Sequence, residues 1–251
     1  MRNASRARPG ARFRALLFSV LPSVCAAQTA HDLMPGRELA IAGAGLGTSG
    51  IGLLLRHGNA SKPAPAIDLV RVPAVDRWST RQWHPRAHRA SNLLFVGTLT
   101  ASFAGGFVLQ GAHRPFDPAA ITAETFLLTS GLTSVAKELV RRPRPYRFNP
   151  DAPASMHHPR EDFVSFWSGH TANTAAVAFS VAALVQRSDA SPAMKSTVWA
   201  GAVAAPIGMG YLRMRAGRHF LTDVLTGAIV GTAVGLAVPY FHRTSESSLT
   251  P

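Results

Sequence analysis

Apolar stretches about as long as a membrane-spanning helix recur six times along this chain of 251 residues, and polar or basic segments separate them. Only 16% of the residues are charged, against about 25% in ordinary soluble domains, so composition also favours a membrane protein. We therefore predict an all-α fold, a bundle of six transmembrane helices. The predicted spans cover residues 39–55, 92–109, 119–136, 170–185, 197–212 and 224–241.

The N-terminal segment is basic and then briefly apolar. Residues 1–14 carry several arginines and no acid, and a short apolar run over 15–24 is followed by small residues. This layout is typical of a secretory signal peptide, here cleaved after Ala27, or else of an uncleaved basic segment. The expected regions are 1–27 for this segment, 28–90 for the first span and a long basic loop (56–90), 91–241 for a membrane domain, and 242–251 for a polar tail.

The net charge of +13 raises the question of nucleic-acid binding, but the positive residues lie between apolar runs and no nucleic-acid motif is present. Anionic lipid headgroups and phosphate esters fit this distribution better. The single cysteine, Cys25, excludes an internal disulfide and a metal site built from several cysteines.

The first polar cluster follows the third span. Lys137 and Arg144 are seven residues apart, so both would lie on one face if the helix continued, although Pro143 and Pro145 predict that it ends and leaves Arg144 on a loop. A lysine offers a mobile point charge, and an arginine offers a planar fork that matches two phosphate oxygens. The alternative is an ordinary positive flank of a membrane helix.

The second cluster, Ser168-Gly169-His170, opens the fourth span. A glycine lets the backbone approach a ligand closely, and the N–H groups at a helix N-terminus bind anions. His170, with an ordinary pKa near 6.5, is suited to proton transfer. The alternative is a helix cap formed by Ser168 beside an unrelated histidine.

The third cluster joins the last two spans and contains Arg213, His219 and Asp223. We expect Gly217 to break the chain between Arg213 and His219. His219 and Asp223 are four residues apart, so on a helical turn the carboxylate can accept the imidazole N–H and leave the other ring nitrogen free as a nucleophile or base. The alternative is an interfacial salt bridge. With six spans, all three clusters lie on the same side of the membrane.

The basic loop contains two further pairs of polar residues. His84 and His88 are four residues apart, but the surrounding loop offers no further obvious ligands, so we predict no metal there. Asp76 and Arg77 are candidates for docking this loop onto the bundle.

Together the three clusters resemble the signature of the type 2 phosphatidic acid phosphatase (PAP2) superfamily, which includes vanadium haloperoxidases and bacterial acid phosphatases. Every internal spacing is kept, while Trp167 stands where the family has proline and Leu212 where it has serine. The matching positions are Lys137 with Arg144-Pro145, then Ser168-Gly169-His170, then Arg213 with His219 and Asp223.

The resemblance, which covers roughly residues 90–241, implies a membrane phosphatase acting on a lipid phosphomonoester or diphosphate. It implies that His219 attacks phosphorus to form a phosphohistidine, that Asp223 holds its ring, and that His170 protonates the leaving oxygen. It assigns phosphate binding to Lys137, Arg144, Ser168, Gly169 and Arg213. We expect no cofactor and no metal requirement, since three cations can stabilise the transferring phosphoryl group.

Two other functions remain open: a vanadate-dependent haloperoxidase-like enzyme, and a non-catalytic protein that binds or transports lipid phosphates. The substrate candidates are phosphatidate, phosphatidylglycerol phosphate, undecaprenyl diphosphate and a lipid A phosphate, which the sequence does not rank. The expected location is a bacterial-type inner membrane. Most Lys and Arg residues lie on the side of the site, which the positive-inside rule assigns to the cytoplasm, whereas the resemblance implies the periplasm, which we favour.

Overall fold

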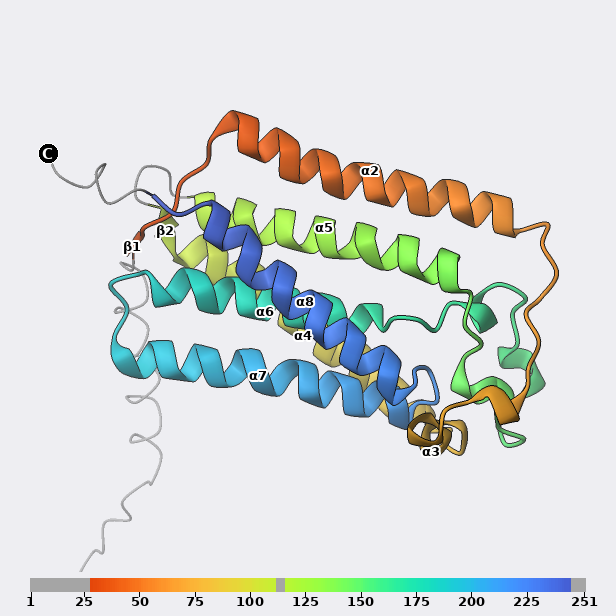
Figure 1. The fold of residues 1–251 in the computed structure, drawn as a ribbon. Coiled ribbons are helices and arrows are strands. Elements are labelled where there is room, and N and C mark those ends of the chain that lie inside the picture. The colour runs from red at the N-terminus through yellow and green to blue at the C-terminus, as the bar shows by residue number, and fades with distance from the viewer. Residues whose placement is uncertain (1–27, 112–115, 245–251) are drawn as a thin grey trace, which may run out of the picture.

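The structure is a computed structural model that describes residues 28–111 and 116–244, and it shows one elongated bundle of helices (Figure 1). The predicted signal peptide, residues 1–27, lies outside the described residues, as does most of the predicted polar tail. The predicted all-α class is confirmed, apart from two strands of two residues each.

Six long helices form the bundle, and each contains most of one predicted span. They are α2 (Pro35–Asn59), α4 (Pro85–Val108), α5 (Asp117–Val140), α6 (Gly169–Gln186), α7 (Pro192–Arg215) and α8 (Leu221–Phe241). Among the described residues, α2, α4, α8 and the segment Asp117–Phe148, which contains α5, are long and apolar enough to cross a membrane. The predicted count of six spans is therefore not confirmed: α6 opens on polar residues, and α7 carries Lys195, Arg213 and Arg215.

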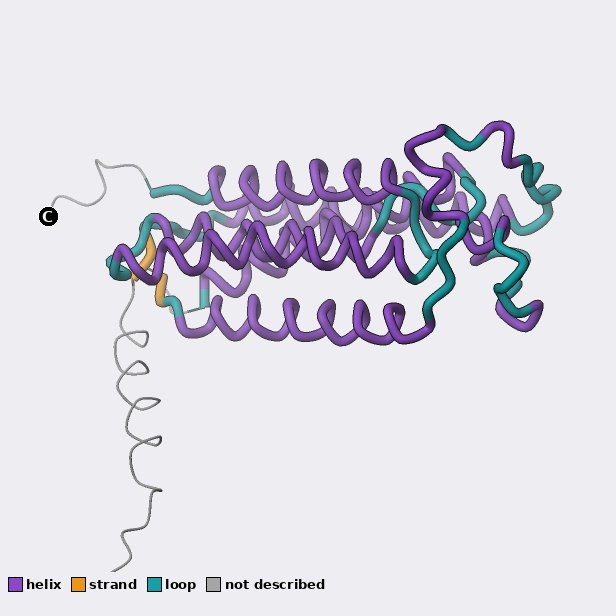
Figure 2. The backbone as a smooth tube through the Cα atoms, turned by 90° about the horizontal axis from the view of Figure 1, so that it is seen from below, coloured by secondary structure: helices purple, strands orange, loops and turns teal. Residues whose placement is uncertain are grey.

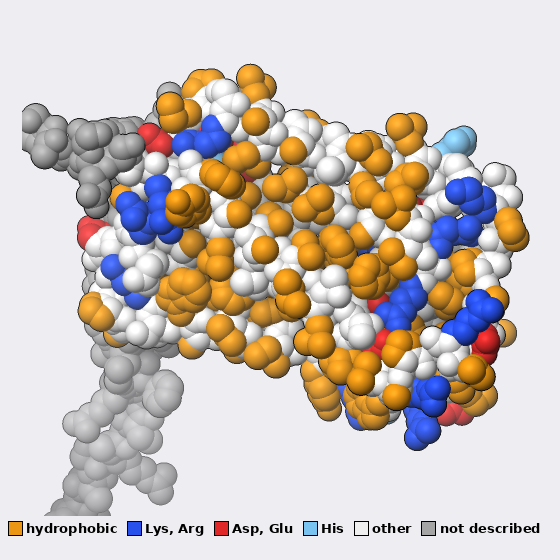
Figure 3. All heavy atoms as spheres, in the orientation of Figure 1, with side chains coloured by type: hydrophobic (Ala, Val, Ile, Leu, Met, Phe, Trp, Pro, Cys, Tyr) orange, Lys and Arg blue, Asp and Glu red, His pale blue; other side chains and the backbone are white. Residues whose placement is uncertain are grey.

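Apolar side chains cover the middle of the bundle surface, and lysines and arginines gather toward its two ends (Figure 3). Large hydrophobic residues such as Leu46, Leu53, Leu93, Ile207 and Ile229 are at least half exposed on the outer faces of their helices. Exposed apolar surface of this extent fits lipid rather than water. With four candidate spans, it describes a multi-pass membrane protein.

The loop predicted over residues 56–90 is shorter than expected, because helices occupy both of its ends. Helix α2 continues to Asn59, and α4 already begins at Pro85. Proline is well tolerated at the first position of a helix, where its missing N–H has no helical partner, so Pro85 starts a helix instead of marking a loop. The short helix α3 (Arg77–Thr80) and two 3₁₀ turns (Leu69–Arg71, Ala74–Asp76) fill the remainder. Three further 3₁₀ turns lie between α5 and α6: Pro145–Phe148, Ala154–Met156 and Glu161–Phe163.

A row of glycines brings α8 against α6. A Cβ atom on Gly227, Gly231 or Gly235 would lie 2.7, 2.1 or 2.4 Å from a backbone oxygen of α6 or of its N-cap residue Ser168. Because these glycines recur every four residues, they form one face that lets the two backbones touch, as small residues do in membrane helix pairs. The contact fixes the start of α8 beside the start of α6.

The two ends of the bundle differ in structure. At one end the long connections and 3₁₀ turns gather, and at the other the parallel strands β1 (Gln28–Thr29) and β2 (Gln110–Gly111) pair (Figure 2). The chain also closes on itself at the strand end, where Asp32 N–H donates to His242 O at 3.0 Å and Thr244 N–H donates to Ala30 O at 3.1 Å.

Candidate active site

The three polar clusters meet at the end of the bundle that carries the long connections. The C-terminal ends of α5 and α7 and the N-terminal ends of α6 and α8 all lie there (Figure 1). The three clusters thus share one end of the bundle, as required if they lie on the same side of the membrane.

Lys137 lies in the last turn of α5, and its Nζ donates to the Val164 carbonyl at 2.6 Å. The helix ends at Val140, so Arg144 sits on the following loop, as Pro143 and Pro145 predicted, and the two cations do not share a helix face. The buried Arg144 guanidinium donates to Glu161 O at 2.5 Å and to Arg218 O at 3.2 Å. Arg144 is thus held against the backbone that precedes His219.

Ser168 is the N-cap of α6, and its side-chain oxygen accepts a hydrogen bond from the Thr171 N–H at 3.4 Å. Its own N–H donates to Asp223 O at 3.0 Å, so this amide is not free to bind an anion in this structure. A Cβ on Gly169 would lie 3.0 Å from Thr133 Cγ2 and 3.7 Å from Lys137 Cε, which places the first residue of α6 beside the Lys137 side chain.

The His170 ring, in the first turn of α6, is held by two residues of α4. Its Nε2 lies 3.1 Å from Asn92 Oδ1, and its ring centroid lies 4.5 Å from that of Phe95. Because a carbonyl oxygen only accepts, this contact makes Nε2 the protonated nitrogen and leaves Nδ1 without that proton.

Arg213 is buried near the end of α7 and also contacts α4. Its Nη1 lies 3.1 Å from His88 Nδ1 and 3.2 Å from Ser91 Oγ. Its Nε is buried without a hydrogen-bond partner among the described residues. The guanidinium therefore keeps an unused donor at the site, as expected of a group that binds an anion.

The His219 ring differs from expectation in its orienting partner. Nδ1 lies 2.8 Å from the Ser165 carbonyl and 3.7 Å from Asp223 Oδ2, so the ring N–H donates to the backbone and not to the carboxylate. The predicted direct bond requires both residues on one helical turn, but α8 begins only at Leu221 with Phe220 as its N-cap. The donated Nδ1 proton leaves Nε2 as the lone-pair nitrogen of a neutral ring.

Asp223 is fully buried and accepts three hydrogen bonds from other donors. Arg142 Nη1 lies 2.6 Å from Oδ1, and Ser165 Oγ and the Phe220 N–H lie 2.5 and 2.9 Å from Oδ2. Since Ser165 supplies both the hydroxyl that binds Asp223 and the carbonyl that binds His219, the carboxylate positions the ring through Ser165.

A buried ion-pair network extends from Asp223 to the basic loop. Arg142 also donates to Asp76 Oδ2 at 2.7 Å, and Asp76 accepts from the Thr222 N–H at 3.0 Å. Both carboxylates are completely buried, and Arg142 joins them. Asp76 thus docks the loop onto the bundle, as predicted, whereas the Arg77 side chain only donates to Val72 O within the loop.

The electrostatics of the cluster favour a neutral His219. Burial lowers the pKa of this histidine well below its ordinary value, and the positive charges of Lys137, Arg144 and Arg213 lower it further. A cavity of about 280 Å³ opens beside the ring's cationic neighbours, and its lining includes Lys137, Arg144, Thr133 and Asn173 together with Glu138 and Glu161. The cations around His219 and its neutral imidazole are suited to an anion, because the Asp223 carboxylate is already bound by its own donors.

The two departures from the family pattern differ in their surroundings. The Trp167 indole N–H donates to Thr133 Oγ1 at 2.8 Å, which ties the loop before Ser168 to α5. Leu212 is half-buried in α7, and no contact of its side chain explains why it replaces a serine.

Sequence reasoning missed Arg142, Ser165 and the face of α4 that carries His88, Ser91, Asn92 and Phe95. Their spacing at i, i+3, i+4 and i+7 was a usable signal, since it marks one face of a helix that starts at Pro85. No spacing signal points to Arg142, because its partners are far away in the sequence.

The comparisons with known proteins agree with this geometry. The fold and the site define the protein as a membrane bundle of apolar helices with an anion site at one end. Residues 118–247 match the sequence model of the PAP2 superfamily. The chain belongs to this superfamily. It is also similar to the crystal structure of a transmembrane PAP2-type phosphatidylglycerolphosphate phosphatase from Bacillus subtilis, with a TM-score of 0.51 and 23% identity, covering 78% of this chain and 94% of that one. No curated protein matches the chain.

Proposed function

We propose that this protein is a membrane phosphatase that hydrolyses a phosphomonoester or diphosphate of a lipid through a phosphohistidine at His219. The observation that carries the proposal is the state of the His219 ring. Its Nδ1 proton is committed to Ser165 O, and burial, together with the positive charges of Lys137, Arg144 and Arg213, lowers its pKa and keeps the ring neutral. Its Nε2 lone pair is therefore available within a positively charged cluster that attracts phosphate.

In the first step, Nε2 attacks phosphorus, an N–P bond forms, and the P–O bond to the lipid breaks. His170 acts in its doubly protonated form: it gives its Nδ1 proton to the leaving oxygen and becomes neutral, while its Nε2–H stays hydrogen-bonded to Asn92 Oδ1. In the second step, His170 takes a proton from a water molecule whose oxygen attacks phosphorus, the N–P bond breaks, and inorganic phosphate leaves. The Asn92 and Phe95 contacts hold the His170 ring in place for both proton transfers.

Lys137, Arg144 and Arg213 hold the phosphoryl oxygens and stabilise the charge that they carry in the transition state. Gly169 lets the substrate approach the α6 backbone, and Ser168 fixes the start of that helix. Asp223 acts as a positioning residue through Ser165, since it does not touch the His219 ring at hydrogen-bond distance. We expect this chemistry to need no metal ion.

A lipid substrate is supported by two apolar cavities that follow one another along the bundle, the first of them beginning near the site. Two cavities of about 460 and 440 Å³ lie between α4, α6 and α7 and share the lining residues Ala101, Val181 and Val198. The first begins at Leu93 and Leu94, directly after Asn92, which contacts His170. A hydrocarbon tail in this groove would bury its apolar surface while its phosphate reaches the cations.

The proposed location of the site is the periplasmic side of an inner membrane. Ser155 is exposed on the loop between α5 and α6, at the site end of the bundle. In a Cys25→Ser background, Ser155→Cys should react with a membrane-impermeant thiol reagent in whole cells. Protection in whole cells, with labelling after lysis, would place the site in the cytoplasm.

The deciding experiment measures phosphate release by the purified protein from the four lipid phosphates named above and from a short water-soluble phosphomonoester. We expect turnover of at least one lipid, and a loss of at least about a thousand-fold in His219→Ala, as is typical when a nucleophile is removed. His84→Ala, which alters an exposed histidine of the loop, is the matched control and should retain wild-type turnover. Acid-labile, base-stable labelling of the wild type by a ³²P-labelled substrate, absent in His219→Ala, would identify the intermediate.

Wild-type turnover in His219→Ala would refute the assignment. Halide oxidation by peroxide after vanadate loading, without phosphate release, would favour the haloperoxidase alternative. Binding of the lipids without release would favour the non-catalytic one.

A further inference from the structure

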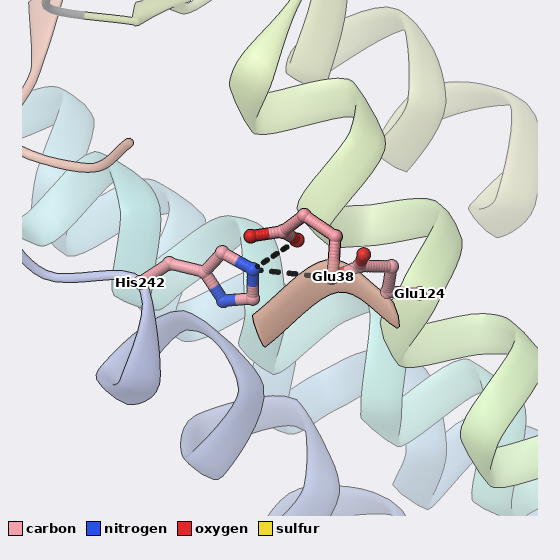
Figure 4. A group of neighbouring side chains, drawn as sticks. All are labelled: Glu38, Glu124 and His242. Carbon is pink, nitrogen blue, oxygen red and sulfur yellow. Dashed lines mark hydrogen bonds and ion pairs between the residues drawn. The ribbon is translucent and has the colours of Figure 1, made fainter. Parts of the chain in front are cut away.

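A second polar cluster lies at the opposite end of the bundle and takes no part in the proposed reaction. It consists of Glu38 from the first turn of α2, Glu124 from α5 and His242, which follows the last residue of α8. Figure 4 shows the three side chains converging, with the His242 ring nitrogen facing both carboxylates. One ligand atom from each residue lies within 4.8 Å of the other two.

The His242 ring is fixed in the orientation that metal-binding histidines adopt. Its Nδ1 lies 2.7 Å from the Val238 carbonyl, which therefore accepts the Nδ1 proton. Nε2 is then left to face Glu38 Oε2 at 2.8 Å and Glu124 Oε2 at 3.1 Å. A backbone carbonyl on one nitrogen and the ligand on the other is the usual arrangement around a metal-bound imidazole.

The Glu38 carboxylate is fixed in the same way. Its Oε1 accepts hydrogen bonds from the Met34 N–H at 2.9 Å and from Arg37 Nε at 3.3 Å, which leaves Oε2 for the cluster. His242 Nε2 and Glu38 Oε2 are thus each held facing the centre of the cluster.

In the part of the chain that the structure describes, one carboxylate oxygen of the cluster lacks a hydrogen-bond donor. Even if Nε2 carries a proton, it can donate that proton to only one carboxylate. Glu124 Oε2 lies in ion-pair range of Nε2. This oxygen is nevertheless buried with no hydrogen-bond donor among the described residues. Arg37 meets the charge of Glu38 through Oε1, whereas Glu124 Oε2 has no such partner within residues 28–111 and 116–244. A divalent cation held by the three facing atoms would supply the partner that Glu124 Oε2 lacks.

The distances also suit a metal ion. Ligands bound at about 2.0–2.1 Å in tetrahedral geometry lie about 3.3 Å apart, close to the separations of Nε2 from the two carboxylate oxygens. A further histidine lies at this end: His31 is fully buried, and neither ring nitrogen has a hydrogen-bond partner among the described residues. It precedes Asp32, whose N–H donates to His242 O.

We propose that Glu38, Glu124 and His242 bind a divalent transition-metal ion, with Zn²⁺ the best match to one imidazole and two carboxylates. The ion joins the start of α2 and α5 to the end of α8, so it closes the end of the bundle at which the described chain begins and ends. Its role is structural, since the residues proposed to react lie at the other end.

The test uses the full chain, purified in detergent without a histidine tag and stripped with EDTA. Zn²⁺ and, separately, Mn²⁺ are titrated while bound metal and thermal unfolding are measured. We expect about one Zn²⁺ per chain and a higher unfolding temperature with the ion. Glu124→Gln keeps the shape of the side chain but removes its charge, and it should weaken binding at least tenfold and abolish most of the thermal shift.

His84→Ala is the control for adventitious binding and should bind Zn²⁺ like the wild type. Circular dichroism shows whether Glu124→Gln is folded; if it is not, Glu38→Gln provides the same comparison, and the wild-type stoichiometry stands as an independent measure. Phosphate release below the unfolding temperature should be the same with and without the ion. Equal affinity and equal thermal shift in wild type and Glu124→Gln, or no binding by the wild type, would show that the cluster is only an ion-pair network.

Discussion

Each end of the bundle holds a fully or almost fully buried histidine whose Nδ1 donates to a backbone carbonyl. Nδ1 of His219 donates to Ser165 O at 2.8 Å, and Nδ1 of His242 donates to Val238 O at 2.7 Å. What differs is the charge that faces Nε2. Cations surround His219, whereas two carboxylates approach His242.

The pKa of a histidine is therefore shifted in opposite directions at the two ends of the bundle. Burial and the neighbouring cations lower the pKa of His219, so its ring stays neutral with the Nε2 lone pair available. Burial alone would lower the pKa of His242 too, but the hydrogen bonds to Glu124, Val238 and Glu38 raise it above the ordinary value. Burial lowers the pKa of both histidines, so the opposite net shifts come from the partners that each ring meets.

The largest expected effect comes from replacing Arg142, which pairs with both buried acids at the end of the bundle that holds the candidate site. Arg142→Met leaves Asp76 and Asp223 buried without their shared partner, which should lower the free energy of unfolding by about 3 kcal/mol or more. Phosphate release should fall as well, because Asp223 positions Ser165 and through it His219. Chemical denaturation and a turnover assay measure the two effects.

Arg86→Met is the control for this loss of charge, since Arg86 is exposed, and it should change stability by no more than about 0.5 kcal/mol. A similar small change in Arg142→Met would mean that the buried acids do not depend on this ion pair.

A smaller effect is expected from the contact that sets the start of α8 against α6. In Gly227→Ala the new Cβ would lie 2.7 Å from Ser168 O, so the helices must separate, at a cost of about 1–3 kcal/mol. Turnover should drop about tenfold or more because the reacting groups shift. The Zn²⁺ affinity of the opposite end should stay unchanged.

Gly50→Ala serves as the matched control, since nothing lies within 4 Å of a Cβ at Gly50 in α2. Equal turnover in the two variants would show that the α6–α8 contact does not position the site.

The smallest effect is the pH dependence of stability due to His219. Its pKa in the folded protein is below the unfolded value near 6.5, so below that pH the unfolded chain takes up a proton that the folded chain does not. The wild type should therefore lose stability relative to His219→Gln as the pH falls from 7.5 to 5, by at most about 1.4 kcal/mol per pH unit. Unfolding measured in phosphate-free buffer at several pH values tests this, and a constant difference between the two proteins would contradict it.

The sequence alone predicted the features that depend on local order. Apolar runs located the six long helices, Gly217 with φ of +66° breaks the chain before His219 as expected, and Pro143 and Pro145 left Arg144 on a loop. The motif spacings identified the superfamily because they follow from chain geometry at helix ends. Whether all six helices span the membrane could not be read from apolarity, since α6 and α7 mix apolar residues with polar ones.

Only the tertiary structure decided which atoms meet. The i, i+4 spacing predicted a direct bond between His219 and Asp223, yet the late start of α8 gives the ring N–H to Ser165 O and assigns the carboxylate to Arg142. Nothing in the sequence links Glu38, Glu124 and His242, because they come from three distant segments that join only when the bundle closes. Spacing in the sequence determines which side chains lie together at one helix end. The packing of the helices determines which groups those side chains bind.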